Sequence, residues 1–526
     1  MDATSGPDAA QLVDARRRVG GLYAWWVLAV LVLVYVVNFV DRQIMAILAD
    51  DIRADLGVGD AEMGFLYGTV FGVFYALFGI PLGRLADGWH RIRLLTIGLA
   101  LWSAMTALSG FARSFNQLAA ARIGVGVGEA SASPVAFSVL SDYFPREKRA
   151  TALAIYSSGL YIGGGLSLFI GGLIVNRWNA TFPDGGPLGL VGWQAAFVIV
   201  GLPGLLLALV VATLKEPIRG LADGIASPPE PRPFARFFAE LSSVLPPLTL
   251  LHAARFGRRA LAANLWALVV AGLLVALVVR VTGNAPQWIA IGLAGYAIFS
   301  WAQSIRRRDP PTFALIWGTP AFLYLVGAFG LISMIGYATA FWQAPYALRV
   351  FAADRALAGL FLGGGGALGG FLGVILGGRL SDAFKARHPS GRILIGFVAL
   401  LGAAPFFIAQ FTVTDETVFY VVAFLASVFA STWVGVAAAT VQDLVLPRMR
   451  GAATATYFLG TTIIGLGLGP FYVGKMSEVL GDLGQAVLSL YVFAPLVILL
   501  LVLLFRALPQ AEASRVERAR AAGEKI

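Results

Sequence analysis

The sequence contains no cysteine and only three histidines among its 526 residues. The lack of cysteine excludes disulfides, thiol chemistry and cysteine metal sites. Charged residues are also scarce: they make up 13% of the chain, against about 25% in a typical soluble domain, and 58% of the residues are hydrophobic. No Gly-x4-Gly-Lys-Ser/Thr phosphate loop occurs, which removes the simplest case for a pump driven by ATP. We therefore expect an integral membrane protein without a metal, another cofactor or a catalytic site.

The apolar runs are long enough to cross a bilayer as helices, which need roughly 20 residues each. They lack the segments of about 10 alternating residues that are typical of membrane barrels. The expected fold class is therefore an all-α membrane protein. Six spans fit each half of the chain, at about 24–47, 61–86, 93–113, 116–140, 149–175 and 191–214, and at about 314–345, 356–381, 392–412, 417–441, 452–474 and 485–508.

The two halves repeat one another. The run Gly-Arg-Leu-Ala-Asp at 83–87 returns as Gly-Arg-Leu-Ser-Asp at 378–382. Four more residues recur about 300 positions later, Asp142, Arg149, Tyr156 and Gly159 as Asp443, Arg450, Tyr457 and Gly460. Paired repeats of membrane helices are a known way to build a transporter around a site at their interface.

Two further apolar runs lie between the halves, at about 262–280 and 286–304. A turn-like segment separates them, and Arg306, Arg307 and Arg308 follow. We predict an inserted transmembrane hairpin, which brings the total to about 14 spans. A pair of helices lying in the membrane plane is the alternative.

The predicted organisation has six parts: a cytoplasmic tail at 1–22, a six-helix bundle at 23–214, a cytoplasmic linker at 215–261, the hairpin at 262–305, a second six-helix bundle at 306–508 and a cytoplasmic tail at 509–526. Most of the 39 Lys and Arg fall on the side of the termini. This bias is typical of cytoplasmic loops, so it indicates orientation and not nucleic-acid binding. We expect a monomer in a bacterial inner membrane, with both termini cytoplasmic.

Several motifs resemble a known family. The spacing Gly83-x3-Asp87-x3-Arg91-x-Arg93 resembles the signature loop of the major facilitator superfamily, and Arg122 followed by two glycines resembles its second motif. The resemblance covers nearly the whole chain and implies the major facilitator fold. In the second half, Asp382 is not followed by basic residues at the same spacing, and the hairpin is not part of the twelve-helix core.

Within that superfamily, three segments resemble the spinster branch: 38–43 (Asn-Phe-Val-Asp-Arg-Gln), 128–130 (Gly-Glu-Ala) and 141–145 (Ser-Asp-Tyr-Phe-Pro). Members of this branch are associated with export of sphingolipid and lysophospholipid-type molecules. The resemblance therefore implies a lipid-like substrate.

Four charges are unexpected inside apolar spans: Asp41, Arg42, Arg122 and Glu129. Such groups are expensive in a bilayer, so each needs a partner or a function. Arg122 and Glu129 lie about 10 Å apart along one helix, which predicts partners across helices, for example Asp41 with Arg122. Static ion pairs are the alternative to a functional role.

All three histidines fall in predicted loops, so a proton relay has to use carboxylates. Burial favours the neutral acid and a nearby arginine favours the carboxylate, so movement between two states can load and release a proton. We predict Asp41 and Glu129 as the proton-coupling residues.

The two buried arginines are candidates for binding an anionic head group, since a guanidinium can hold phosphate or carboxylate by two hydrogen bonds. The full set of predicted substrate-binding residues is Tyr35, Asn38, Arg42, Arg122, Ser133, Tyr337, Gln343 and Trp433. The second half supplies the neutral and aromatic members, which suits an amphiphile with an anionic head and an apolar tail.

The repeated loop residues are predicted to control opening of the bundles. Asp87 and Asp382 lie at cytoplasmic helix ends, where we expect contacts with loop arginines such as Arg91 or Arg149. The predicted gating residues are Gly83, Asp87, Arg91, Arg93, Asp142, Arg149, Asp382, Asp443 and Arg450.

The sequence thus predicts a secondary transporter that moves a lysolipid- or sphingolipid-like anion by alternating access, with coupling to protons. A carrier of small organic anions, sugar acids or drugs is the first alternative. A membrane-embedded lipid-modifying enzyme is the alternative from another class, and it is disfavoured because no Ser-His, His-Asp or metal-ligand set is apparent.

Overall fold

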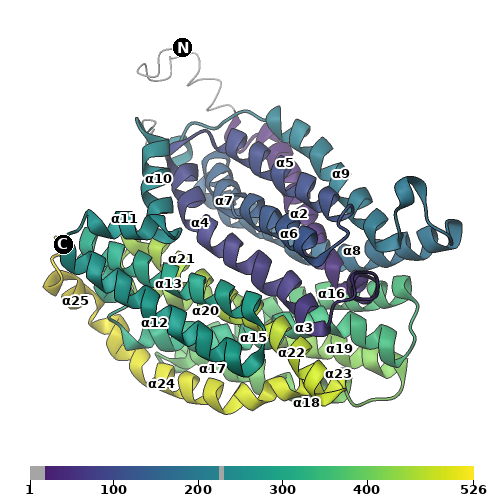
Figure 1. The fold of residues 1–526 in the computed structure, drawn as a ribbon. Helices are drawn as coiled ribbons and strands as arrows, with labels where there is room; N and C mark the ends of the chain where they lie inside the picture. Colours follow the sequence, from purple (N-terminus) through teal and green to yellow (C-terminus); the bar gives the residue numbers. More distant parts are fainter. Residues whose placement is uncertain (1–17, 224–229, 526) are drawn as a thin grey trace.

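The computed structural model describes residues 18–223 and 230–525, in which every regular element is a helix. Figure 1 shows two bundles, the first (purple to blue) above the second (green to yellow). The first bundle consists of α2 (Leu22–Leu56), α3 (Asp60–Gly64), η1 (Phe65–Val70), α4 (Phe71–Gly88), α5 (Arg91–Ser109), α6 (Phe115–Glu129), α7 (Ala132–Tyr143), α8 (Arg146–Thr181) and α9 (Gly192–Ala212).

The second bundle contains more breaks within its spans. Its elements are α14 (Pro310–Ile316), α15 (Pro320–Val350), α16 (Arg355–Arg387), η4 (Gly391–Ile393), α17 (Leu394–Phe397), η5 (Val398–Gly402), α18 (Ala404–Gln410), α19 (Glu416–Ala430), α20 (Val434–Asp443), η6 (Pro447–Met449), α21 (Arg450–Thr461), η7 (Thr462–Leu466), α22 (Gly467–Leu480), α23 (Leu483–Leu488), η8 (Ser489–Phe493), α24 (Ala494–Ala513) and α25 (Arg515–Ala521).

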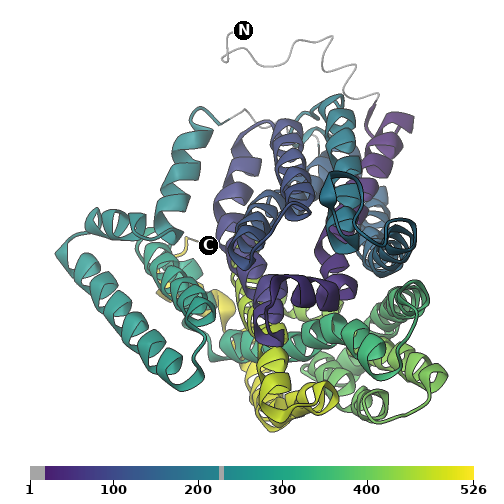
Figure 2. The ribbon, with the colours of Figure 1, turned by 45° about the vertical axis from the view of Figure 1, so that its right-hand side comes forward.

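The segment between the bundles is helical as well. Two short helices, α10 (Pro233–Val244) and α11 (Leu248–Ala254), are bent by 103° and precede the hairpin helices α12 (Arg258–Thr282) and α13 (Ala285–Arg308). Figure 2 shows the hairpin as a separate layer beside the bundles, with α12 outermost. Fourteen helices of the described residues are long and apolar enough to cross a membrane, hairpin included, which confirms the predicted fold class and number of spans.

Helix α2 is longer than the sequence predicts. The expected span ends at about Ile47, but the helix continues to Leu56 and ends at Gly57, whose φ of 64° is the left-handed conformation that glycine adopts readily. Asp41 therefore lies near the middle of a 35-residue helix. The extension carries two aspartates that contact the second bundle.

We call one end of the bundles the near end: there, consecutive helices are connected by residues 88–91, 143–146 and 443–450. The opposite end is the far end, where residues 56–60 and 350–355 connect consecutive helices. The two bundles are joined by ion pairs at the far end. Arg349 of α15 binds Asp50 of α2 at 2.6 Å and Asp60 of α3 at 2.7 Å. Arg355 of α16 binds Asp51 of α2 at 2.8 Å. These pairs hold the far end closed.

Small residues let the facing helices approach closely in the same half of the molecule. Gly363 of α16 packs on the backbone of Gly165 in α8, and Gly359 packs on the carbonyl of Leu168. On the other side, Gly64 of α3 packs on the backbone of Pro470 in α22. Small residues at helix crossings are typical of membrane bundles. Any larger side chain at these positions separates the bundles.

We predict that Gly363→Ala lowers the free energy of unfolding by about 1–3 kcal/mol, because the added methyl group collides with the Gly165 carbonyl. Thermal unfolding of the purified protein in detergent measures the effect. Gly364→Ala is the matched control, since nothing lies within 4 Å of a Cβ at that position. Equal unfolding temperatures for the two variants would contradict this account of the contact.

Candidate functional site

The central feature of the first bundle is a buried ion pair between α2 and α6. The Arg42 guanidinium donates to one oxygen of Glu129 from two nitrogens, Nη2 at 2.7 Å and Nε at 3.2 Å. Arg42 is 6% exposed and Glu129 is 1% exposed. The second oxygen of Glu129 has no hydrogen-bond partner among the described residues. The pair is therefore enclosed but not fully satisfied.

Aromatic rings surround the cation of this pair. The guanidinium carbon of Arg42 lies 4.5 Å from the ring centre of Phe71, 4.9 Å from that of Phe39 and 5.0 Å from that of Tyr75. Cation–π contacts of this kind strengthen when water is excluded. Sequence reasoning did not find Phe71 and Tyr75, because aromatic residues in an apolar span give no signal that separates ligands of a cation from lipid-facing residues.

Asp41 is completely buried, and neither of its carboxylate oxygens has a hydrogen-bond partner in the described part of the chain. Thr106 and Trp102 of α5 are its polar neighbours and are buried like it. The predicted pairing of Asp41 with the Arg122 side chain is wrong. Arg122 instead directs Nη1 to the backbone carbonyl of Asp41 at 3.4 Å, because the carboxylate projects toward α5.

Arg122 has no exposed surface either. Its Nε and Nη2 atoms find no acceptor within residues 18–223 and 230–525, and its guanidinium carbon lies 5.4 Å from the ring centre of Phe71. Arg122 and Asp41 are thus a buried cation and a buried acid that lie near each other without a direct hydrogen bond between their side chains.

Three half-buried residues, Tyr35, Ser133 and Tyr337, mark the accessible edge of the cluster. Tyr35 of α2 stacks on Tyr156 of α8 at 4.5 Å between ring centres, and both lie next to Ser133 of α7. Tyr337 of α15 is half-buried and close enough to Arg42 to interact with it electrostatically. Six of the predicted substrate-binding residues therefore gather here: Tyr35, Asn38, Arg42, Arg122, Ser133 and Tyr337.

The two other predicted substrate-binding residues make contacts inside the second bundle. Gln343 accepts a hydrogen bond from Gln410 of α18 at 3.3 Å. Trp433 stacks on Phe329 of α15, with 5.5 Å between ring centres. Within the described residues, neither makes a hydrogen bond, an ion pair or a ring contact with the charged cluster.

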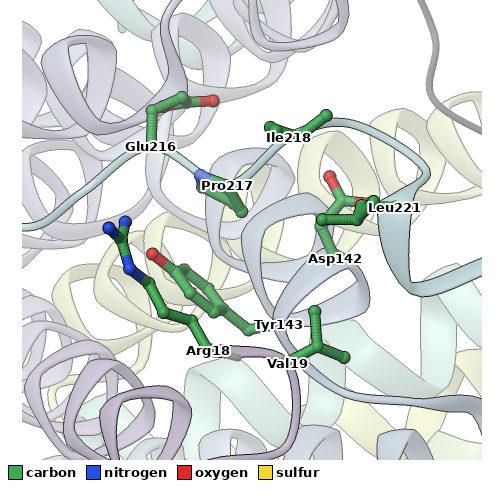
Figure 3. A pocket seen from close by; sticks show the side chains of 8 residues that line it. All are labelled: Arg18, Val19, Asp142, Tyr143, Glu216, Pro217, Ile218 and Leu221. Atoms are coloured by element: carbon green, nitrogen blue, oxygen red, sulfur yellow. The ribbon is translucent and has the colours of Figure 1, made fainter. Parts of the chain in front are cut away.

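The repeated aspartates of the two halves make matching contacts at the near end. Asp142 binds Arg91, the first residue of α5, and Arg91 also binds Glu216 at 2.7 Å. Asp443 binds two basic residues of the second half, Lys385 at 3.1 Å and Arg392 at 2.6 Å. Figure 3 shows Asp142 and Glu216 lining a small pocket at this end. The internal repeat is therefore visible in side-chain contacts as well as in sequence.

Arg149 binds a carboxylate of the linker and not Asp87. Its Nη2 donates to Asp223 at 3.1 Å, and Arg146 donates to the same oxygen at 2.8 Å. These hydrogen bonds, first from Arg146 and then from Arg149, lower the pKa of Asp223 below its usual value. The linker is thereby attached to the near end of α8.

The remaining predicted gating residues are less engaged. Asp87 is exposed, lies 4.0 Å from Arg84 and lines a second pocket with Glu230 and Arg236 of the linker. The expected contact of Asp87 with Arg91 or Arg149 is not formed, because both arginines bind other carboxylates. The side chains of Arg93, Asp382 and Arg450 are exposed, and Gly83 has open space beside it.

Sequence reasoning missed the far-end residues Asp50, Asp51, Asp60, Arg349 and Arg355. A signal was present, since three acidic residues end and begin spans of the first half while two arginines do so in the second. Charge of opposite sign at facing helix ends could have suggested this contact.

These features are those of a known family. The family model of the Major Facilitator Superfamily matches residues 31–387. The chain belongs to the major facilitator superfamily. This assignment sets aside the enzyme alternative, because members of the superfamily are transporters.

Full-length relatives agree with the assignment. An MFS-type efflux pump of Mycolicibacterium smegmatis is 27% identical over 492 residues, which cover 92% of this chain and 93% of the pump. Protein spinster homolog 1 of Homo sapiens is 25% identical over 459 residues, which cover 86% of this chain and 72% of that protein.

Among solved structures, the chain is similar to a bacterial homolog of the human lysosomal transporter spinster, in an inward-facing and unoccupied conformation. The TM-score is 0.65 and the identity 26%, with 95% of each chain covered. Together these similarities confirm the predicted resemblance to the spinster branch.

We predict that Glu129→Gln lowers the free energy of unfolding by about 3–5 kcal/mol, because it leaves the buried Arg42 cation without its carboxylate. A double variant, Arg42→Met with Glu129→Leu, recovers most of the loss, since it removes both charges. Chemical or thermal unfolding in detergent measures all three proteins. A double variant no more stable than Glu129→Gln would show that the pair is not what balances these charges.

Proposed function

We propose that the chain is a proton-coupled carrier that exports a single-chain anionic amphiphile, of lysolipid or sphingolipid type, by alternating access. The observation that carries the proposal is the set of four buried ionisable side chains in one bundle, one of them a carboxyl group without hydrogen-bond partners in the described structure. Groups of this kind inside a membrane protein are typical of proton and substrate pathways. The lipid-like substrate rests on the resemblance to the spinster branch, which the similarity to spinster relatives supports.

In this mechanism Asp41 holds the proton while the far end is closed. An ionised carboxylate enclosed without donors is costly, so the neutral acid is favoured. When the bundles rock, water or a guanidinium reaches the group and the proton leaves. Glu129 acts with it, because release of Arg42 from Glu129 leaves a carboxylate that takes up a proton and a cation that binds the substrate head.

The orientation follows from the same reasoning. The near end, which carries the basic loops, faces the cytoplasm of a bacterial inner membrane, as the charge bias of membrane proteins requires. The closed far end then faces outward in the proposed orientation. We propose that one chain is the functional unit, since each bundle contributes to one central site.

Export of a drug or of a small organic anion is the second candidate. The full-length similarity to an efflux pump favours it. Both candidates use the same cation, so the substrate must be distinguished by its tail.

We predict that Asp41→Asn folds and still binds substrate but loses the pH dependence of transport, because the amide cannot carry a proton. Counterflow and gradient-driven uptake in proteoliposomes at several pH values measure this. Asp184→Asn, at an exposed loop carboxylate, is the control and keeps the pH dependence of the unsubstituted chain. An unchanged pH profile for Asp41→Asn would remove Asp41 from the coupling step.

We predict that Arg42→Gln weakens binding of a single-chain phosphomonoester lipid by roughly 10- to 100-fold, the effect of a lost charge-assisted hydrogen bond. Binding of a monoacylglycerol with the same tail changes little. Ligand-induced thermal stabilisation of the purified protein compares the two lipids with a short organic anion. Equal losses for charged and neutral lipid would assign Arg42 a structural role, and stabilisation by the short anion alone would favour the second candidate.

A further inference from the structure

The inserted hairpin packs on the seam between the two bundles. Ala297 and Trp301 of α13 share one apolar cluster with Val73 and Leu77 of α4 in the first bundle and with Ile463 of η7 in the second. By contrast, α12 exposes most of its apolar side chains. The hairpin therefore uses one helix to contact both bundles and the other to face the surroundings of the protein.

One polar side chain of the hairpin is buried in this seam. Gln287 of α13 is 1% exposed, and its Nε2 donates to the carbonyl of Gly467 in α22 at 3.0 Å. Its Oε1 lies 2.5 Å from the hydroxyl of Thr69 in η1, which lies equally close to the Gly467 carbonyl. The hydroxyl has one proton and serves one of these acceptors at a time. Gln287 thus connects the first bundle to the second.

The contact forms where both partner helices are irregular. Thr69 lies in η1 and Gly467 directly follows η7, and both of these segments are π-helical. Such segments are rare and often occur at functional positions. The two segments contact each other where the two helices that line this side of the seam cross.

The base of the hairpin is fastened to both bundles at the near end. Glu240 of α10 is buried and binds Arg308 at 3.0 Å, with Arg84 of α4 at 3.7 Å. The residue after α13, Asp309, binds Arg448 of the second bundle at 2.7 Å. The hairpin therefore cannot leave the seam without breaking ion pairs at its base.

We propose that the inserted hairpin is a strap that stabilises the far-end-closed state, and that Gln287 is the residue through which it does so. Opening of the far end separates Thr69 from Gly467, and Gln287 can then keep only one of its two partners. The lost hydrogen bond leaves a buried polar group unpaired, which opposes opening. The inference does not depend on the substrate or on proton coupling.

The experiment measures distances in the purified full-length chain. Because the chain contains no cysteine, introduced cysteine pairs can be spin-labelled without background. A far-end pair at Ala54 and Val479 and a near-end pair at Glu147 and Ala386 use exposed positions on opposite bundles. Pulsed electron resonance then gives the populations of the open and closed states at each end.

Gln287→Leu is expected to raise the ratio of far-end-open to far-end-closed molecules by about fivefold to tenfold. The ratio of near-end-open to near-end-closed molecules, measured with the near-end pair, is expected to fall. Gln303→Leu is the matched control: it is the same change on the same helix, but the hydrogen bonds of Gln303 within the described structure go to Asn264 and to the carbonyl of Ala260, both in the hairpin. Its distances match those of the unsubstituted chain.

Thr69→Val is the second variant, because it removes the same connection from the first bundle and needs no change in the hairpin. Thr69→Val is expected to raise the far-end-open population as Gln287→Leu does. The double variant is expected to show little more of this shift than either single variant. Unchanged distances in both variants would overturn the proposal, and so would an equal shift in Gln303→Leu.

Discussion

The structure depends on keeping two cations and two acids inside an apolar bundle. Removing a charge from water costs several kcal/mol unless a partner compensates it. Arg42 and Glu129 compensate each other across α2 and α6, and three aromatic rings complete the surroundings of the cation. Asp41 and Arg122 lack direct compensation by one another's side chains. Any movement that brings water or a ligand to this cluster therefore changes the electrostatic surroundings of these four groups.

The contacts between the two bundles determine which end of the molecule is closed. They concentrate at the far end, where Arg349 is shared by two aspartates and glycines bring helices into backbone contact. At the near end, Arg91 pairs with Asp142 and Arg392 with Asp443 inside each bundle. The base of the hairpin connects the bundles there through the ion pairs of Glu240 and Asp309, while the ion pairs of Arg349 and Arg355 close the far end.

The helices, the repeat and the hairpin could be predicted because apolar length and internal period are properties of the sequence alone. The buried charges could be found for the same reason, since a charge inside an apolar run is conspicuous. Their partners could not, because side-chain direction depends on how α2, α5 and α6 cross. Asp41 projects toward Thr106, and Arg42 forms an ion pair with Glu129. Gln287 is a similar case: one neutral amide in an apolar hairpin gives no sign that it reaches both bundles.

We propose that substrate binding and proton exchange share the four charges of the first bundle. Calorimetric titration of the purified chain with a single-chain phosphomonoester lipid, repeated in buffers of different ionisation enthalpy, counts the protons exchanged on binding. The account predicts a binding enthalpy that varies with the buffer and corresponds to about one proton per bound lipid. A binding enthalpy that is the same in every buffer would contradict it.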